Sequence, residues 1–486
     1  MPLSRRRRRG YGGAMIAAVT DHLGLIYLVC EWIIRLAMLA VVPRRRNSPS
    51  ARSWLLFIFF LPIPGVLIYA AIGRPAFAQW RAERFRRLAP FFADTNARMR
   101  PAGLRIPNAQ NRKAVDLADS VGGFPAIGGN AIELMDGYDQ TIDRLVADID
   151  AARFSVRLLV YIFADDATGM KVIDALARAV ARGVKCHVLL DPVGSHRWRR
   201  GTVSRLRSAG VEVREALPYR LLHRRTRGDM RNHRKLFVID GAIGYAGSQN
   251  IVAKDFRPGV TNQELVVRVV GPVVAAMTAV FVADWFLETE TMLCNAVDVP
   301  APAGAVVAQI LPSGANYALE GFATLLVWLI HTAQHSVVVT TPYLIPEEEL
   351  MGAMRTAVLR GVRVSIIVSA VADQRLVRLA QESYYEDLLA AGVSIYLFEN
   401  YLLHAKNVSI DGRLSIIGSS NVDLRSFQLN EEVSLLIPDE ATTMMLDATQ
   451  DRAITGSRQL LLEDWKRRSR PRRFAENLAR LLSPLL

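Results

Sequence analysis

The 486-residue chain has few cysteines and no obvious metal-binding cluster. Its three cysteines, Cys30, Cys186 and Cys294, lie far apart and form no C-x-x-C pair. The sequence therefore offers neither zinc-site spacing nor a disulfide framework, and it fits a reducing compartment. No group of carboxylates suggests a bound metal ion either, so we expect neither a metal nor a cofactor.

Lysine is absent from the first 100 residues, and the rest of the chain carries almost no net charge. Residues 1–100 hold 17 arginines and four acidic residues, a net charge of +13, which leaves about +1 of the total +14 for the other 386 residues. A nucleic-acid-binding protein would carry its positive charge on the folded domain that grips phosphate. Here the arginines flank apolar segments, which indicates a membrane and disfavours nucleic acid.

Two apolar segments in this region predict a transmembrane hairpin at residues 1–75. Residues 23–42 carry Glu31 and Arg35, an i,i+4 pair that can neutralise itself on one helix face. Residues 54–72 carry no charge, although their prolines would kink a spanning helix. A signal peptide is disfavoured because no small-residue cleavage site follows the first segment. Ten arginines flank the two ends of the hairpin and four lie in its loop, which predicts that both ends are cytoplasmic.

Residues 76–125, punctuated by arginine and proline, are typical of a linker, and beyond them helical and strand patterns alternate. The order helix, strand, helix, strand is predicted twice, over 141–152, 154–163, 170–183 and 184–190, and then over 322–334, 335–345, 348–361 and 362–369. This alternation indicates an α/β fold with two repeats, each a mixed sheet flanked by helices, at 126–300 and 305–486. The basic, amphipathic C-terminal tail either packs on the core or docks on anionic lipid headgroups.

The two halves share a spaced set of polar residues. The stretches NHRKLFVIDGAIGYAGSQN (232–250) and LHAKNVSIDGRLSIIGSSN (403–421) share a skeleton of six residues at one offset of 171. The matched residues are His233, Lys235, Asp240, Gly247, Ser248 and Asn250, and then His404, Lys406, Asp411, Gly418, Ser419 and Asn421. A lone H-x-K carries no information, but six matches at a fixed offset indicate an internal duplication.

Each stretch predicts a β-hairpin that gathers its polar residues on one face. Residues two apart on a strand share a face, so the H-x-K pair points one way and the S-x-N pair does the same. If Asp240 and Gly241 form a two-residue turn, His233 lies opposite Ser248, and the second stretch has the same geometry. We expect Asp240 and its counterpart Asp411 to be turn residues and not catalysts.

Two imidazoles, two ammonium groups and two amides suit phosphodiester chemistry. Lysines and amides stabilise the equatorial oxygens of the phosphoryl group through the transition state. One imidazole can attack phosphorus and form a covalent intermediate, while the other protonates the departing alcohol and deprotonates the incoming one. One repeat supplies only one imidazole, so the two repeats together would complete the site. The residues alone do not decide which histidine attacks.

Each histidine is expected to have an acidic partner. Glu264 lies 31 residues after His233, and Glu432 lies 28 residues after His404, in the contexts NQE and NEE. We predict that each glutamate orients the histidine that precedes it and fixes its tautomer. A serine-hydrolase interpretation of the two G-S-x-N serines is weak, because no G-x-S-x-G elbow surrounds them.

With these residues the chain resembles the phospholipase D superfamily, whose H-x-K-x4-D-x6-G-S-x-N signature occurs twice. Within it, the blocks MRNHRKLFVIDGAIGYAGSQNI and SSNVDLRSFQLNEEVSLLI, the TPYLIP segment and the RLLSPLL ending are similar to bacterial cardiolipin synthases. This resemblance implies transfer of a phosphatidyl group between two phosphatidylglycerol molecules in the bacterial cytoplasmic membrane, giving cardiolipin and glycerol. It favours His233 as the nucleophile. The N-x-D-x-R-S-F run at 421–427 has no counterpart in the first half.

Four alternatives remain at this point. A hydrolase would use the same site with water as the acceptor, and another transferase would use a different donor, such as phosphatidylethanolamine. A nuclease is disfavoured because the part of the chain beyond the arginine-rich region is nearly neutral. A non-catalytic membrane scaffold is disfavoured because the histidine, lysine and asparagine residues are intact in both repeats.

Overall fold

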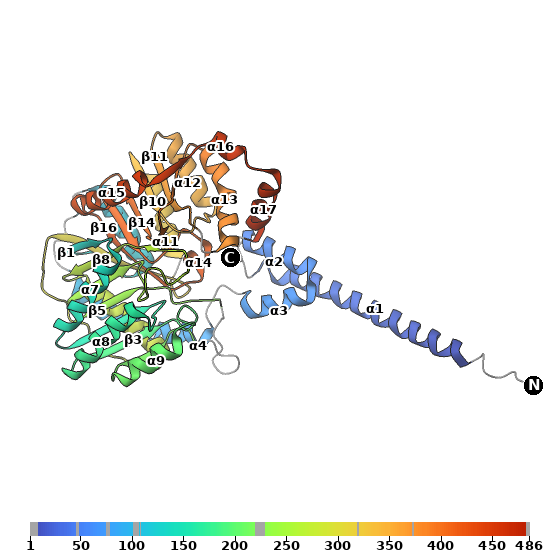
Figure 1. Ribbon diagram of the computed structural model, residues 1–486, viewed down its shortest axis with the longest axis horizontal. Helices are drawn as coiled ribbons and strands as arrows, with labels where there is room; N and C mark the ends of the chain where they lie inside the picture. The colour runs from blue at the N-terminus through green and yellow to red at the C-terminus, as the bar shows by residue number, and fades with distance from the viewer. Residues whose placement is uncertain are drawn as a thin grey trace, which may run out of the picture. The chain divides into compact units, whose positions relative to one another are not determined.

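The computed structural model describes residues 8–44, 48–73, 78–100, 106, 108–218, 229–317, 320–371 and 374–482. The chain divides into two compact units, a small one within residues 1–75 and a large one within residues 76–484 (Figure 1). The predicted helices and strands beyond residue 126 all form, within a few residues of their expected ends. The mixed α/β fold expected from the alternating pattern is therefore confirmed.

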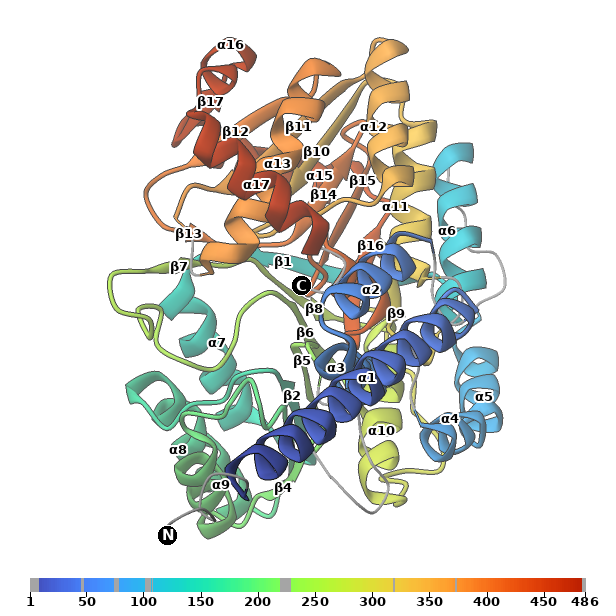
Figure 2. The ribbon, with the colours of Figure 1, turned by 90° about the vertical axis from the view of Figure 1, so that its right-hand side faces the viewer.

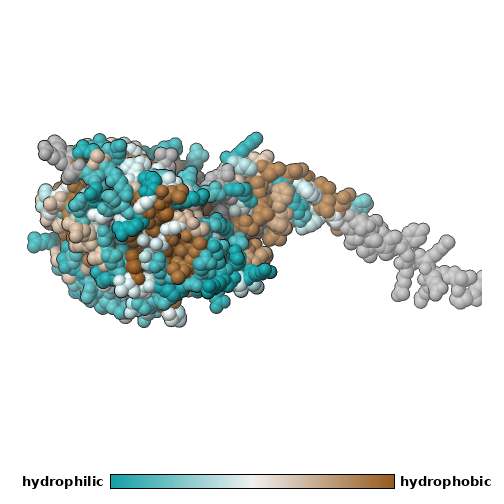
Figure 3. All heavy atoms as spheres, turned by 90° about the horizontal axis from the view of Figure 1, so that it is seen from above, coloured by the Kyte–Doolittle hydropathy of each residue, from teal (hydrophilic) through white to brown (hydrophobic). Residues whose placement is uncertain are grey.

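The described part of the small unit contains three apolar helices, α1 (Arg8–Val41), α2 (Ser48–Phe60) and α3 (Pro62–Ile72). Brown spheres in Figure 3 show their apolar surface. Among the described residues, α1 is the one helix long and apolar enough to cross a membrane, through His22–Val41. The second span predicted over 54–72 is not a continuous helix. It is divided at Pro62, which cannot donate a helical hydrogen bond and instead occupies the first turn of α3.

The described part of the large unit is built on one 15-stranded mixed sheet (Figure 2). Its strands, in spatial order, are β17 (Ser457–Leu460), β12 (Ser394–Phe398), β11 (Arg363–Ser369), β10 (Ser336–Thr340), β14 (Asn407–Ile410), β15 (Leu414–Gly418), β16 (Glu432–Ile437), β9 (Val306–Ser313), β1 (Ile127–Met135), β8 (Val266–Val270), β6 (Ile243–Gly247), β5 (Leu236–Ile239), β2 (Ser155–Val160), β3 (Lys185–Leu190) and β4 (Glu212–Glu215). A second sheet pairs β7 (Asn262–Gln263) with β13 (Leu402–Leu403).

The strand order is the same in both directions from the contact between β9 and β1. The series β1, β8, β6, β5, β2, β3, β4 corresponds to β9, β16, β15, β14, β10, β11, β12, and β17 is added at one edge. In both series the first four pairs are antiparallel and the last two are parallel. The two halves meet at the middle of the sheet, so segments that leave its central strands can come together.

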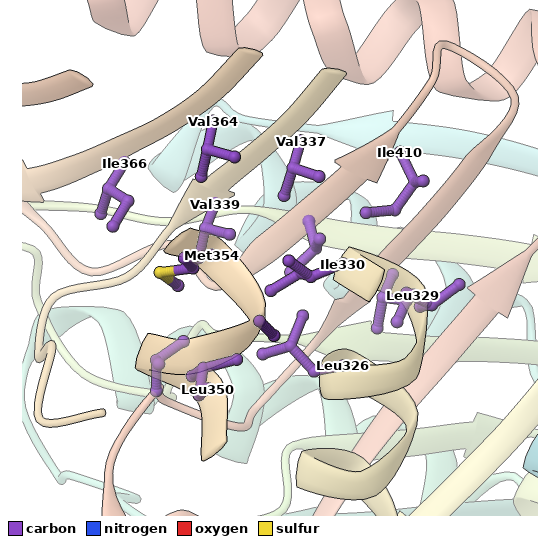
Figure 4. Packing of buried hydrophobic residues seen from close by; sticks show 14 of the residues in the cluster. Leu326, Leu329, Ile330, Val337, Val339, Leu350, Met354, Val364, Ile366 and Ile410 are labelled. Carbon is purple, nitrogen blue, oxygen red and sulfur yellow. The ribbon is translucent and has the colours of Figure 1, made fainter. Parts of the chain in front are cut away.

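Helices cover the sheet and bury its apolar side chains. In the second half, Leu326 and Ile330 of α11 and Met354 of α12 pack on Val337 and Val339 of β10 (Figure 4). The helices are α7 (Tyr138–Ala151), α8 (Ala167–Ala181), α9 (Arg199–Ser208), α10 (Val274–Thr289), α11 (Gly321–Thr332), α12 (Glu348–Leu359), α13 (Arg375–Ala390), α14 (Leu424–Gln428), α15 (Glu440–Thr455), α16 (Leu462–Lys466) and α17 (Arg470–Leu482).

The segment expected to be a linker also contributes to this unit. It contains α4 (Gln79–Arg86), α5 (Ala89–Met99) and α6 (Ala109–Gly122). Phe91 and Met99 of α5 are buried in the same apolar cluster as α10, while Ala114 and Ala118 of α6 are buried with α11. These helices therefore belong to the packed core of the large unit, because their apolar faces are covered.

Candidate active site

The first H-x-K pair precedes β5 and the first S-x-N group follows β6, so one hairpin carries both. The pair Ile239–Ile243 closes this hairpin around three residues, Asp240 to Ala242, and not around the predicted two. Asp240 and Gly241 have positive φ values of 52° and 65°, and Ala242 adds the third residue. The register is shifted by one residue, so the predicted histidine–serine pairing does not form. The hairpin of β14 and β15 has the same three-residue loop.

The two turn aspartates anchor the hairpins to a neighbouring strand. The Asp240 carboxylate accepts the backbone N–H groups of residues 153–155 at 2.7 to 2.8 Å, at the start of β2. The Asp411 carboxylate accepts those of residues 334–336 at 2.7 to 3.1 Å, at the start of β10. Both aspartates therefore lie in the hairpin loops and tie them to the backbone of β2 and β10.

Each histidine segment pairs with a glutamate segment of the other half. The N–H of His233 donates to the carbonyl of Glu431 at 2.9 Å, and the N–H of Glu431 donates to the carbonyl of Arg231 at 2.8 Å. In the other pair, β13 runs parallel to β7, and the N–H of His404 donates to the carbonyl of Gln263 at 2.8 Å. Each pairing places the next residue of the partner segment, a glutamate, beside the imidazole.

The histidine–glutamate pairs are consequently exchanged between the halves. His233 Nδ1 lies 3.0 Å from both carboxylate oxygens of Glu432, and His404 Nδ1 lies 2.8 and 2.9 Å from those of Glu264. The prediction that each glutamate orients the histidine preceding it is wrong, because the strand-like pairing crosses the middle of the unit. An ionised carboxylate can only accept, so Nδ1 carries the proton and Nε2 keeps its lone pair.

The environment keeps both imidazoles neutral near pH 7. Burial lowers the pKa of His233 and lowers that of His404 to about 4, against the opposing effect of the glutamate beside each. The positive charges of Lys235 and Lys406 lower the pKa of both imidazoles further. Because each lysine acts on both histidines, the four groups form one electrostatic site.

The two lysines are buried behind the histidines. Lys235 Nζ donates to the carbonyl of His233 at 2.7 Å, and Lys406 Nζ donates to the carbonyl of His404. Burial lowers the pKa of Lys235 to about 7 and that of Lys406 to about 8. The ammonium of Lys235 also lies 5.2 Å from the ring centroid of Tyr161, a cation–π contact that favours its charged form.

The two asparagines face the same space with different amide partners. Asn250 Oδ1 accepts the N–H of Ile162 at 3.0 Å, which leaves its NH₂ group for a ligand. Asn421 Oδ1 is buried and has no hydrogen-bond partner among the described residues. A buried polar atom without a partner is costly, so this amide oxygen is suited to a ligand group that donates a hydrogen bond, such as a hydroxyl.

The two serines support the glutamates unequally. Ser419 Oγ donates to Glu432 Oε2 at 2.5 Å and accepts the N–H of Val433 at 3.0 Å. Ser248 Oγ accepts the N–H of Leu265 at 3.0 Å and lies 3.2 Å from its carbonyl. Both serines are fully buried, so neither is exposed to act as a nucleophile.

Both histidines and both asparagines line one cavity of about 370 Å³. This volume lies at the lower end of the range for small-molecule sites and suits a polar headgroup. Charged and aromatic side chains surround it, namely Tyr161, Arg231, Arg257, Tyr343, Asp423 and Arg425. In the described parts of the chain, no group of three or more His, Cys, Asp or Glu side chains is arranged to hold a metal ion.

Sequence reasoning missed a buried charged network behind the first histidine. Arg234 Nη1 donates to both Asp284 oxygens at 2.5 and 2.6 Å, and Nη2 donates to Glu431 Oε2 at 2.7 Å. Its Nε donates to the carbonyl of Glu432 at 2.9 Å. Arg234 therefore fixes the backbone that carries Glu432. One difference inside the motif could have indicated this network: the first half reads H-R-K, and the second half reads H-A-K.

The fold and the paired H-x-K segments are those of the phospholipase D class. A family model described as "Cardiolipin synthase, PLD-like domain" matches residues 145–285 and 326–453, and "Phospholipase_D-nuclease N-terminal" matches residues 32–74. The chain is 34% identical over 483 residues to cardiolipin synthase A of Erwinia tasmaniensis, covering 95% of this chain and 99% of that protein. The chain belongs to the cardiolipin synthase family.

Two further relatives are similar in sequence, and one solved structure is similar in fold. Cardiolipin synthase A of Serratia proteamaculans and that of Yersinia pseudotuberculosis are each 34% identical over 485 residues, covering 95% of this chain and 99% of the relative. Among solved structures, phosphatidylserine synthase of Haemophilus influenzae covers 78% of this chain and 100% of its own, with a TM-score of 0.60 at 15% identity. That likeness concerns the fold alone.

Proposed function

We propose that this protein transfers a phosphatidyl group from one phosphatidylglycerol molecule to a second, giving cardiolipin and glycerol. The observation that carries the proposal is one cavity lined by two histidines, each with Nδ1 on a glutamate of the other half. Two imidazoles with Nε2 available supply the nucleophile and the acid–base group of a two-step transfer. The full-length similarity to cardiolipin synthases supports this reaction.

In the first step, His233 Nε2 attacks the phosphorus of the donor lipid. The bond from phosphorus to the headgroup glycerol oxygen breaks, and His404 gives that oxygen a proton. The negative phosphodiester raises the pKa of His404 when it binds, which favours the protonated form that the step needs. The products are a phosphatidyl-histidine and free glycerol.

In the second step, His404 removes a proton from a hydroxyl of the acceptor phosphatidylglycerol. The hydroxyl oxygen attacks phosphorus, the bond from phosphorus to Nε2 breaks, and cardiolipin is formed. The charges of Lys235 and Lys406 stabilise the phosphoryl oxygens in both steps, together with the side-chain NH₂ groups of Asn250 and Asn421, which can donate to them. Ser248, Ser419, Glu264 and Glu432 hold these groups in place, and Asp240 and Asp411 hold the hairpins.

We infer that the two halves are pseudo-symmetric repeats of one unit. Their strand orders correspond, and the H-x-K and S-x-N residues occupy equivalent places around β5 and β6 and around β14 and β15. Each histidine needs a glutamate from the other half, so one half alone lacks a complete site.

The cavity also favours a lipid acceptor over water. A second phosphatidylglycerol brings its own phosphate, and Arg231, Arg257 and Arg425 line the cavity with the guanidinium groups that bind phosphate well. Hydrolysis needs no second anion site. The cavity volume suits headgroups and leaves the acyl chains outside it, which agrees with an enzyme held at a membrane. We place it in the bacterial cytoplasmic membrane with the site on the cytoplasmic side.

A product assay tests the proposal. The purified full chain is added to vesicles of phosphatidylglycerol alone, with a chelator present, and the lipids are resolved. Cardiolipin and glycerol with little phosphatidic acid is the expected result. Phosphatidic acid and glycerol would identify a hydrolase instead. If phosphatidylglycerol alone gives no product and added phosphatidylethanolamine restores turnover, the donor assignment is wrong.

A further inference from the structure

We propose that α2 and α3 form a re-entrant hairpin that enters and leaves the bilayer on one side, so that the chain crosses the membrane once, through α1. This proposal concerns the small unit and stands independently of the reaction. It replaces the two-span hairpin that hydropathy predicted. Three observations within this unit lead to it, and a fourth, from the sequence, is compatible with it.

The first observation is that α3 folds back along α2. A continuous helix would separate Trp54 and Tyr69 by about 22 Å at about 1.5 Å per residue. Their ring centroids instead lie 5.2 Å apart in an edge-on contact. A Cβ added to Gly65 would meet the Cα of Ile58 at 2.9 Å, so glycine permits the close approach of the two helices. The segment therefore reverses direction near Pro62.

The second observation is the length of the two arms. With 13 and 11 residues, α2 and α3 are about 20 and 16 Å long, while the hydrocarbon layer is about 30 Å thick. Neither arm can span it. The tip is apolar, since Phe60, Leu61 and Ile63 are exposed there and no charged residue lies between Trp54 and Ile72. Such a tip is stable inside hydrocarbon and not in water.

The third observation fixes the depth of the tip against α1. Arg35 Nε donates to the carbonyl of Phe59, one of the last carbonyls of α2, at 3.1 Å. Arg35 lies about 10 Å along α1 from Val42, where the apolar stretch ends. The buried contacts of the hairpin with α1 are at Met38 and Val42. The hairpin thus occupies about one third of the layer, within one leaflet.

The same bond explains why α1 contains two charged residues within its apolar stretch. Helix α2 ends at Phe60, and as at any helix end its last carbonyls lack helical partners, and an unpaired carbonyl costs several kcal/mol in hydrocarbon. Arg35 supplies a donor, and Glu31 neutralises Arg35 through an ion pair of 3.1 Å. The pair is therefore a built part of the hairpin and not a defect of a spanning helix.

The fourth observation is the distribution of arginines. With a single crossing, the four arginines between the two apolar segments join the five at positions 74–87 on one side, against Arg5–Arg9 on the other. The basic loop is then on the same side as the basic residues that follow α3. The count is then nine arginines against five, compared with ten against four for two crossings, so the positive-inside tendency is compatible with either topology.

Cysteine accessibility in proteoliposomes tests the topology. Single cysteines are placed at His22, Arg44 and Glu83 in a full-length chain without its three native cysteines, and each is labelled with a membrane-impermeant maleimide before and after lysis. A single crossing predicts that Arg44→Cys and Glu83→Cys share one side and that His22→Cys has the opposite side. Two crossings would pair His22→Cys with Glu83→Cys, and labelling of all three on one side would exclude any crossing. Either result would overturn the proposal.

A second, independent observation points to another lipid contact, on α17 of the large unit. This helix is attached through its charged face: Arg472 pairs with Glu382 at 2.9 Å and Arg480 with Asp387 at 2.8 Å, both on α13. Glu476 is fully buried and pairs with Arg468 at 2.9 Å. Apart from the small buried side chain of Ala479, the core-facing side of α17 is therefore polar, which reverses the usual orientation of an amphipathic helix.

The outer face of α17 is apolar. Phe474, Leu478 and Leu481 follow the spacing i, i+4, i+7 and have exposed fractions of 71%, 51% and 52%. Exposed Arg467 and Arg470 lie at the start of this stripe. We infer that the stripe inserts into the interface of an anionic bilayer, because an apolar stripe beside basic residues is the pattern of interfacial helices.

Lipid quenching tests this contact in the full chain. A polarity-sensitive fluorophore is attached at Phe474→Cys, Leu478→Cys or Leu481→Cys, with Lys171→Cys, exposed on α8, as the control. Spin-labelled lipids in phosphatidylglycerol vesicles should quench the first three labels and spare the control. Equal quenching at Lys171 would overturn the proposal. The proposal would also be overturned if the three labels became less quenched as the protein density rose at constant lipid. A second copy of the chain would then cover the stripe.

Discussion

The two histidine–glutamate pairs share a geometry but differ in their support. The carboxylate of Glu432 accepts His233 Nδ1 at 3.0 Å, Ser419 Oγ at 2.5 Å and Ser426 Oγ at 3.0 Å. Arg234 also donates to its backbone carbonyl at 2.9 Å. His233 is therefore held by a carboxylate that is itself held at several points.

The other pair has fewer supports. Glu264 binds His404 at 2.8 Å and interacts with Ser248. The residue that corresponds to Arg234 at the offset of 171 is Ala405, and the one that corresponds to Ser426 is Asp255. The first half thus has no equivalent of the N-x-D-x-R-S-F run, whose Ser426 reaches Glu432.

This difference suggests a division of labour. A nucleophile must hold phosphorus in line through two steps, and a rigid imidazole serves that purpose. An acid–base group must serve a leaving alcohol and then an incoming one, which tolerates a less constrained imidazole. The better-supported pair contains His233, so the asymmetry favours His233 as the nucleophile and His404 as the acid–base group.

The largest effects are expected from removing the imidazoles. His233→Ala should abolish turnover, and His404→Ala should reduce it by about 10²- to 10⁴-fold, the usual contribution of general acid–base catalysis. A phosphatidyl donor with a p-nitrophenolate leaving group needs no acid in the first step. It should restore a burst of nitrophenolate in His404→Ala and not in His233→Ala, measured by absorbance after rapid mixing.

The control for both variants is the far-UV circular dichroism spectrum and melting profile, which should match those of the parent chain. A burst in His233→Ala but not in His404→Ala would reverse the assignment. Near-normal rates in either single variant would show that the two halves do not share one site.

Glutamate replacement should give the next largest effect. Glu432→Gln and Glu264→Gln each remove the acceptor that keeps the proton on Nδ1, and loss of the correct tautomer costs up to about 10⁴-fold in triads of this kind. We expect kcat to fall by more than about 10²-fold in both, and further in Glu432→Gln. Steady-state cardiolipin formation measures this, with the exposed Glu83→Gln as the matched control.

If Glu264→Gln affected the nucleophilic burst and Glu432→Gln did not, each glutamate would be acting on the histidine of its own half. The observed exchange between halves would then have no functional meaning.

Much of the large unit follows from local patterns. Apolar runs such as those of β2 and β10, and the amphipathic periods of α8 and α12, are properties of single segments, so they were predicted within a few residues. The polar residues of the site were visible because they recur at one offset. This recurrence supplied the comparison that an isolated H-x-K lacks.

What escaped prediction depends on contacts between distant segments. The exchange of Glu264 and Glu432 arises from the pairing of β13 with β7 and of His233 with Glu431, which no spacing encodes. The third loop residue in each hairpin is set by the strand register. In the small unit, hydropathy shows that residues 54–72 are apolar. It does not show that the chain reverses direction near Pro62, because that reversal depends on the contact of Trp54 with Tyr69.

The pH dependence of kcat/KM should show the ionisation of the two lysines. Burial lowers the pKa of Lys235 to about 7 and that of Lys406 to about 8, so both are charged below these values and lose charge as pH rises through them. We expect kcat/KM to fall above about pH 7 to 8, approaching tenfold per pH unit for one essential proton. The arginine of Lys235→Arg keeps its charge at all these pH values, so the fall in kcat/KM should move to higher pH.

If the fall in kcat/KM at high pH were unchanged in both Lys235→Arg and Lys406→Arg, another group would be responsible for that fall. The acid side of the profile serves as the internal reference, because it reports the imidazoles, and arginine keeps the positive charge that lowers their pKa.

The smallest expected effect bears most directly on the asymmetry. Ser426→Ala removes one of the side-chain donors to Glu432 and should lower kcat by about fivefold, the equivalent of about 1 kcal/mol for one hydrogen bond. Ser120→Ala, exposed on α6, is the control. In a Glu432→Gln background the loss should shrink, because Ser426 is proposed to act through Glu432. A full, additive loss in the double variant would mean that Ser426 acts through Asn421 N–H, which donates to it at 3.2 Å, and that the N-x-D-x-R-S-F run supports the cavity wall and not the nucleophile.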